Sequence, residues 1–128
     1  MTPRAASRLV KAEGFLAQLK SVSSTDAPAG AIHLAYYAML HAASAVLLDQ
    51  LGEAPKTHAG TIGRFSQAVM ANDEGKRFGR ALSKAEQLRM VSDYDDGAVP
   101  TAAEAESTRK TAIEFVAYCR FLLELPSP

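Results

Sequence analysis

Three side chains with useful chemistry stand close together at Arg89, Asp93 and Tyr94. Arg89 and Asp93 are four residues apart, so on a helix they lie one turn apart, where an ion pair can form. A planar guanidinium also suits a phosphate group. Tyr94 is either a partly buried ring with a satisfied hydroxyl or a phenol that donates to a phosphate. Arg89 and Tyr94 are therefore candidates for contact with a phosphate, and all three are candidates for a binding cleft.

The histidines of the chain are His33, His41 and His58. His33 and His41 share a helical stripe with Tyr37 at the spacing of metal ligands, but no Cys or carboxylate joins them, and zinc sites need three or four ligands. A dimer seam or satisfied core histidines are the alternatives, and we predict no metal. His58 belongs either to a structural turn after Thr57 or to the polar lip of a cleft. Tyr37, His41 and His58 complete the candidate binding cleft.

Other sequence signatures of catalysis are absent. The chain has no glycine-rich phosphate loop, no nucleophile elbow and no metal-binding His-Glu pair. We therefore expect no cofactor and no enzyme of an unrelated class.

Apolar spacing predicts the helices that position these residues. Five apolar residues near the start recur at spacings of four and three, which predicts a first helix: Ala5, Leu9, Ala12, Leu16 and Leu19. Residues 21–28 form a predicted loop, with Thr25 or Asp26 as the cap of the next helix. Residues 30–51 are apolar on most sides, which indicates a central helix with Gly52 as its C-cap.

The second half of the chain predicts three more helices. A short one contains Ile62, Phe65 and Val69. Residues 72–79 are charged and include two glycines, so we predict a loop there. Two capping-box pairs, Ser83 with Glu86 and Thr101 with Glu104, predict helices that start at residues 83 and 101. No segment alternates like a strand. The predicted fold is all-α, one domain over residues 1–128, an up-and-down four-helix bundle with an additional short helix.

Composition limits the function classes. The 14 basic and 14 acidic residues give zero net charge, so no global field favours nucleic acid or membranes. Locally, residues 56–89 hold seven basic and three acidic residues, whereas residues 93–106 hold five acids and no base. Cys119, the single cysteine, is predicted to be a buried thiol. No apolar run looks long enough to cross a bilayer, so we expect a cytoplasmic protein.

Three sequence blocks resemble one known family. They are Ala35-Tyr-Tyr-Ala-Met-Leu-His-Ala-Ala43, Lys56-Thr-His-Ala-Gly60 and Leu88-Arg-Met-Val-Ser-Asp-Tyr-Asp95. Their order and spacing resemble the small stand-alone HEPN proteins of bacteria and archaea. The resemblance implies a four-helix core with an extra short helix, homodimerisation, and association with nucleotides or RNA. It also implies a minimal nucleotidyltransferase as partner in a toxin and antitoxin pair.

The chain departs from the family at one functional position. In catalytic HEPN proteins an Arg-x4-6-His motif at a dimer cleft cleaves RNA without a metal. Carried over here, Arg89 occupies the Arg position, but Tyr94 stands where the His is expected. A phenol with an ordinary pKa of about 10 is a poor general base at neutral pH. The usual ribonuclease motif is therefore absent.

Three hypotheses follow from these observations. The first is a dimeric HEPN-like binding protein that works with a nucleotidyltransferase or RNA through a cleft lined by Arg89, Asp93 and Tyr94. The second is a metal-independent ribonuclease toxin in which Arg89 stabilises the phosphorane and Tyr94 or His58 moves protons. The third is a structural helical dimerisation module without a ligand.

Overall fold

The computed structural model describes residues 1–94 and 99–126, except for the side chain of Tyr94. Five helices make up 79% of the described residues, and no strand occurs in the described ranges. They are α1 (Pro3–Leu19), α2 (Pro28–Leu51), α3 (His58–Ala68), α4 (Asp73–Tyr94) and α5 (Ala102–Glu124). The predicted all-α bundle of four long helices and one short helix is confirmed.

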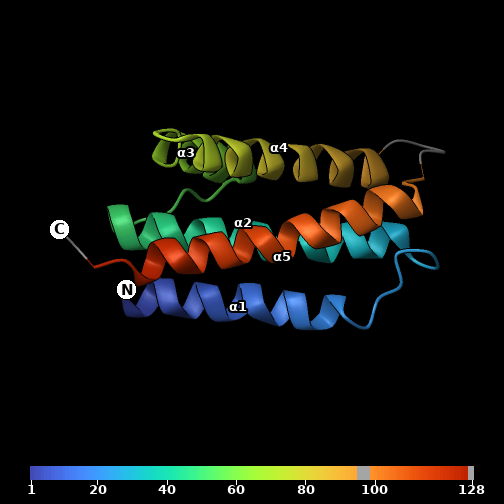
Figure 1. Ribbon diagram of the computed structural model, residues 1–128, viewed down its shortest axis with the longest axis horizontal. Coiled ribbons are helices and arrows are strands. Elements are labelled where there is room, and N and C mark those ends of the chain that lie inside the picture. The colour runs from blue at the N-terminus through green and yellow to red at the C-terminus, as the bar shows by residue number, and fades with distance from the viewer. Residues whose placement is uncertain (95–98, 127–128) are drawn as a thin grey trace.

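The four long helices run alternately up and down (Figure 1). Helix α2 is the centre of the bundle, because it contacts each of the other four helices. Helices α3 and α4 cover α2 and α5 from the side opposite α1, and both termini lie at one end. This arrangement places the α2–α3 connection beside the start of α1, where the candidate site is found.

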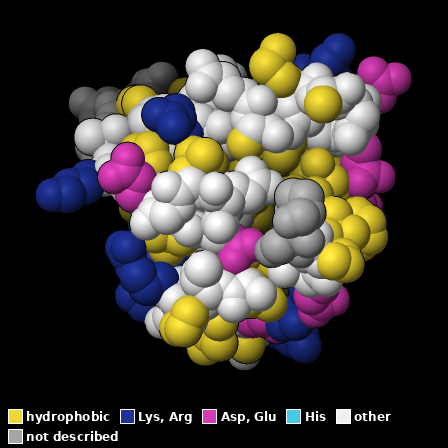
Figure 2. Space-filling model, turned by 90° about the vertical axis from the view of Figure 1, so that its left-hand side faces the viewer, with side chains coloured by type: hydrophobic (Ala, Val, Ile, Leu, Met, Phe, Trp, Pro, Cys, Tyr) yellow, Lys and Arg dark blue, Asp and Glu magenta, His cyan; other side chains and the backbone are white. Residues whose placement is uncertain are grey.

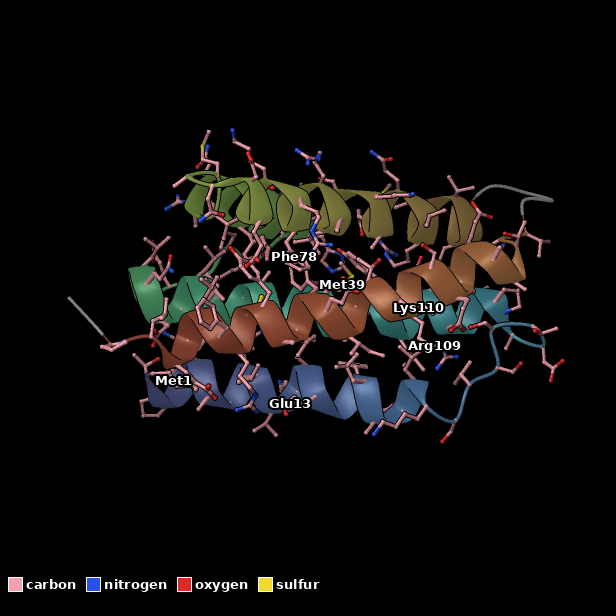
Figure 3. The ribbon with its side chains drawn as sticks, viewed as in Figure 1. Met1, Glu13, Met39, Phe78, Arg109 and Lys110 are labelled. Carbon is pink, nitrogen blue, oxygen red and sulfur yellow. The ribbon has the colours of Figure 1, made fainter. Side chains whose placement is uncertain are left out.

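Helix α2 is buried almost all round because small side chains let its neighbours approach. Its buried residues include six alanines together with Ile32, Tyr36, Met39 and Leu47. Met39 and Phe78 lie between the helix layers (Figure 3). By length and composition α2 could span a bilayer, so the expectation that no apolar run is long enough is wrong. However, 78% of its most apolar window is buried inside the protein, as in the core helix of a bundle.

Several helices begin or end at the capping residues that the sequence predicts. Thr57 Oγ1 accepts from Gly60 N, Thr101 and Glu104 form a capping box, and Gly52 ends α2 with φ of 79°. The prediction that Thr25 or Asp26 caps α2 is wrong, because Ala27 is the N-cap. The backbone N–H groups of Thr25 and Asp26 instead donate to Ser23 Oγ in a local turn.

Helix α4 begins ten residues earlier than Ser83, so the predicted loop over residues 72–79 is wrong. Asn72 caps the start of α4, since its side-chain oxygen accepts a hydrogen bond from Gly75 N at 2.8 Å. Asp73 and Glu74 then complement the positive end of the helix dipole. Gly75 is needed for packing, because a Cβ there would lie 1.7 Å from the Val69 carbonyl oxygen. Ser83 lies within the helix and caps nothing.

One side chain, Arg109, joins distant parts of the bundle. Arg109 Nη1 on α5 donates to the Leu19 carbonyl at 2.7 Å, and Arg109 also contacts Val22 and Ser24 in the α1–α2 connection (Figure 3).

Cys119 is fully buried as predicted, and burial raises the pKa of its thiol. Charges of both signs are interspersed with apolar side chains on the end face shown in Figure 2, consistent with zero net charge.

Candidate functional site

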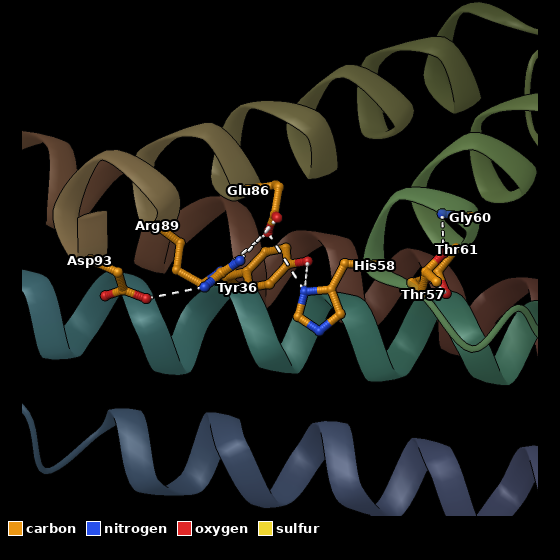
Figure 4. A network of polar contacts seen from close by, with 8 residues as sticks. All are labelled: Tyr36, Thr57, His58, Gly60, Thr61, Glu86, Arg89 and Asp93. Atoms are coloured by element: carbon orange, nitrogen blue, oxygen red, sulfur yellow. Dashed lines mark hydrogen bonds and ion pairs between the residues drawn. The ribbon is translucent and has the colours of Figure 1, made fainter. Parts of the chain in front are cut away.

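Arg89 on α4 forms ion pairs with two carboxylates of the same helix and is shielded from solvent. Its Nε and Nη2 donate to the two oxygens of Glu86 at 3.2 and 3.0 Å, and its Nη1 donates to Asp93 Oδ2 at 3.0 Å (Figure 4). The residue is 8% exposed. The predicted ion pair with Asp93 is therefore present, and Glu86 adds a second, bidentate one.

The guanidinium also packs on aromatic rings of α2. Its Cζ atom lies 5.1 Å from the ring centroid of Tyr36 and 6.0 Å from that of Tyr37. A cation at this distance is attracted by the ring quadrupole. Arg89 is thus held from α4 by carboxylates and from α2 by rings, which fixes its direction.

His58 connects this network to the α2–α3 connection. The Tyr36 hydroxyl shares a 3.0 Å hydrogen bond with His58 Nδ1, and the same nitrogen lies 3.9 Å from Glu86 Oε2 (Figure 4). Because Nδ1 is engaged on this side, Nε2 is the ring nitrogen left for contacts outside the network. A histidine oriented at one nitrogen and open at the other is arranged to exchange a proton.

The network changes the ionisation of its members. Burial alone would raise the pKa of Glu86, but hydrogen bonds from Arg89 and Tyr36, and the charges of Arg89 and His58, outweigh it and lower that pKa. Burial raises the pKa of Tyr36 far above its ordinary value, and the Glu86 carboxylate raises it further. Glu86 is therefore ionised and Tyr36 neutral at physiological pH.

A local turn sets the position of His58. Thr57 Oγ1 accepts from Gly60 N at 3.0 Å, and Thr61 Oγ1 donates to the Thr57 carbonyl at 3.0 Å. A Cβ on Gly60 would lie 2.8 Å from both Pro55 Cβ and Thr57 Oγ1, so glycine permits the close approach. Of the two interpretations of His58, the structural turn is present in the structure.

His58 also lines a basic cleft of about 450 Å³ between α1, α2 and the α2–α3 connection. Its polar lining consists of Arg4, Arg8, Tyr37, His41, Ser44, Lys56, Thr57, His58 and Thr61, and we call it the basic cleft. None of the described residues that line it is acidic. Such a surplus of cationic and hydroxyl groups suits an anion.

His41 is held on the α1 side of the basic cleft. Its ring stacks on Phe15 with centroids 5.4 Å apart, and its Nδ1 lies 3.4 Å from Arg8 Nη1. Because an arginine can only donate, Nδ1 accepts and His41 is neutral in this contact. Burial lowers the pKa of His41, and the positive charges of Arg8, Lys11 and His58 lower it further.

The predicted site residues therefore divide between two connected places. Arg89 and Asp93 belong to the buried network, Tyr37 and His41 line the basic cleft, and His58 belongs to both. The side chain of Tyr94 lies outside the described residues. Among the residues that the structure describes, no group of three or more His, Cys, Asp or Glu side chains could hold a metal ion.

Tyr36, Glu86, Arg4 and Arg8 were not singled out as site residues from the sequence. Tyr36 was assigned to the core and Glu86 to a helix cap. A charged residue three positions before Arg89 was the available signal for Glu86, since i and i+3 share a helix face. Arg4 and Arg8 lie more than 30 residues from His41 in the chain, so only the fold brings them together.

The fold and the sequence blocks agree with a comparison against family models, in which the HEPN domain matches residues 5–122. The chain belongs to the HEPN domain family. HEPN domains are associated with functions that involve nucleotides and RNA. No curated protein shows significant sequence similarity to this HEPN chain.

Proposed function

We propose that this HEPN protein binds RNA or a nucleotide through phosphate in the basic cleft. The observation that carries the proposal is the lining: Arg4, Arg8 and Lys56 surround two histidines without an acidic residue among the described lining. Arginine is suited to phosphate because its planar fork donates two parallel hydrogen bonds. Association with RNA or nucleotides is also the activity that the family implies.

In this proposal Arg89 and Asp93 support the site and do not contact the phosphate directly. Arg89 would have to release two carboxylates and leave burial before it could meet a ligand. Its ion pair with Glu86 instead fixes the carboxylate that lies beside His58 Nδ1. Tyr37, His41 and His58 are the members of the predicted set that we expect to contact a ligand.

The experiment is equilibrium binding of a labelled single-stranded RNA oligonucleotide and of ATP, followed by fluorescence anisotropy. We expect Arg8→Gln and Lys56→Gln to weaken binding and to reduce the salt slope by about one each, because each removes one phosphate contact. Lys110→Gln is the control, since Lys110 is exposed on α5 and lines none of the described cleft. Equal losses for all three variants would reject the cleft as the binding site.

We further propose that the protein acts as the binding component of a toxin and antitoxin type system with a nucleotidyltransferase partner, as a homodimer. The exposed apolar side chains Ile113 (52%) and Phe121 (57%) lie two turns apart on α5 and favour a self-contact. Sedimentation of the wild type and Phe121→Glu tests the dimer. Co-purification with a nucleotidyltransferase encoded beside this gene tests the partner, and a monomer that ignores that protein would contradict both parts.

A second candidate function is metal-independent RNA cleavage, favoured by the orientation of His58. Two histidines line the basic cleft, so one could take the proton of a ribose 2′-hydroxyl while the other protonates the departing 5′-oxygen, giving a 2′,3′-cyclic phosphate. The test is RNA cleavage in chelator by the wild type and by His58→Gln, Arg89→Ala and Tyr94→Phe. Cleavage lost in His58→Gln but kept in Tyr94→Phe would support it, whereas no cleavage by the wild type leaves the binding function.

A further inference from the structure

A second hollow, of about 760 Å³, lies between α3 and α4. These two helices are on the side of the bundle opposite α1 (Figure 1). We call this hollow the α3–α4 groove, and its least exposed lining residues, Ser66, Gly79 and Ser83, form its floor. The floor lies deep because these residues are small, which also lets α3 and α4 approach closely. A Cβ on Gly79 would lie only 3.1 Å from Ser66 Oγ. Carbon atoms make up most of the exposed lining surface, including the aliphatic stems of Lys and Arg side chains. Met70, 57% exposed, is the one apolar side chain of the described lining and stands at the α3 rim.

The α4 rim of the groove is cationic. Lys76, Arg80 and Lys84 are spaced by one turn along the helix, and all three are exposed. Neighbouring Arg77 forms an ion pair with Glu114 at 3.4 Å, whereas no ion pair of the described residues includes any of the three rim cations. Three cations one turn apart that take part in no ion pair of the described residues repel one another modestly, and an anionic partner would relieve that repulsion.

We propose that the α3–α4 groove docks an acidic amphipathic helix of a partner protein. Eight residues separate Lys76 from Lys84, so the cationic rim is about 12 Å long and matches two to three turns of a second helix. Carboxylates at i and i+4 on that helix would face Lys76, Arg80 and Lys84. Its apolar stripe would cover the small-residue floor and Met70, as in the helix-in-groove mode of recognition.

The groove suits a peptide better than a nucleic acid. Apolar surface dominates its lining, and none of its described lining residues is an aromatic ring on which a base could stack. The basic cleft has the opposite character, with Tyr37 and two histidines among its cations. The two surfaces share no lining residue, so occupation of one leaves the other accessible.

The test uses the full chain and a fluorescein-labelled helical peptide of about 14 residues with Glu at i and i+4 beside a Leu stripe. A peptide with Lys in place of every Glu is the comparison. We expect Arg80→Glu to lower the affinity for the acidic peptide about three- to tenfold and to raise the affinity for the Lys peptide, because one rim charge is reversed. Lys110→Glu, which changes the net charge equally on α5, should leave both affinities within about twofold.

Amide chemical shifts of the labelled protein locate the contact. Shifts confined to the floor and rim of the groove support the proposal, and those of Arg8 and His58 should stay unchanged. No binding of the acidic peptide overturns it, as does equal weakening by Arg80→Glu and Lys110→Glu. A single-stranded RNA that competes with the peptide and loses affinity in Arg80→Glu would also overturn it, assigning the rim to nucleic acid.

Discussion

The clearest departure from a simple apolar core is the group formed by Tyr36, Glu86 and Arg89. A buried charge is tolerated only when its partners are close and well aligned, and here one guanidinium is shared by two carboxylates and two rings. Removing one member leaves the others without compensation. The energetic role of Arg89 is therefore larger than that of an ordinary surface arginine.

We predict that Arg89→Ala lowers the free energy of unfolding by about 3 kcal/mol, because Glu86, which is only partly exposed, is left without its counter-charge. Urea denaturation monitored by circular dichroism measures the loss. Arg120→Ala is a matched control, since Arg120 also pairs with two carboxylates, Glu13 and Glu124, but on the surface. It should cost less than about 1 kcal/mol. Similar losses in both variants would show that burial adds nothing to the Arg89 network.

Glu86 gives the network a defined pH dependence. Its pKa in the folded protein lies below the ordinary value of 4.5, so its contribution to stability is present above about pH 4.5 and is lost as pH falls through the folded pKa. We predict that wild type and Glu86→Gln differ most at neutral pH and converge below pH 4.5. Urea denaturation of both proteins between about pH 3 and 7 measures the difference, and a gap that stays constant over this range would contradict the prediction.

One of these contacts follows from the sequence and the others do not, although the sequence singles out both Arg89 and His58. The ion pair of Arg89 with Asp93 is local, so helical spacing predicted it. The contact of Tyr36 with His58 joins α2 to α3, and the sequence gives no sign of which face of α2 meets that turn. Side chains that meet across helices are fixed by packing, which periodicity does not specify.

At the scale of helices, the predicted start of a helix is confirmed where the preceding residue prevents the helix from beginning earlier. Thr101 and Glu104 form a true capping box because Pro100 precedes them and disfavours a continuing helix. Ser83 and Glu86 have the same spacing, but Ala81 and Leu82 allow the helix to pass through. Spacing alone therefore does not define a helix start.

The two glycines in the first turns of α4, Gly75 and Gly79, led to the wrong prediction of a loop, because they serve close packing and not flexibility. We predict that Gly75→Ala destabilises the protein by about 3 kcal/mol or more, since the added Cβ would overlap the Val69 carbonyl oxygen and force the two helices apart. Gly63→Ala on α3 is the control, because nothing lies within 4 Å of its Cβ position. It should stabilise by about 0.5–1 kcal/mol through helix propensity. Thermal unfolding of both variants decides the point, and a neutral Gly75→Ala would contradict the packing argument.

At the scale of the whole molecule, zero net charge conceals separate charged surfaces. The basic cleft between α1 and α2 combines arginines from the start of the chain with Lys56 and two histidines. The sequence surplus over residues 56–89 pointed to cations but not to this surface, because Arg4 and Arg8 lie outside that range. Only the antiparallel pairing of α1 with α2 brings them together.

The proposed function gives this basic cleft a pH dependence that can be measured. The pKa of His41 is lowered by burial and by the charges of Arg8, Lys11 and His58, so the ring is neutral at pH 7. A bound phosphodiester would place a negative charge in the same cleft and raise that pKa, so binding takes up a proton. We therefore predict that RNA affinity increases as pH falls from about 8 to 6, where the phosphodiester itself does not titrate.

The decisive comparison is between the wild type and His41→Asn, which keeps a polar side chain but cannot titrate. The variant should bind RNA with a flatter pH profile, while its affinity near pH 8 stays close to that of the wild type because both side chains are then neutral. A His41 imidazole resonance whose titration midpoint rises on RNA addition would identify the proton acceptor directly. An unchanged midpoint together with tight binding would mean that the phosphate lies elsewhere, and would move the site away from the basic cleft.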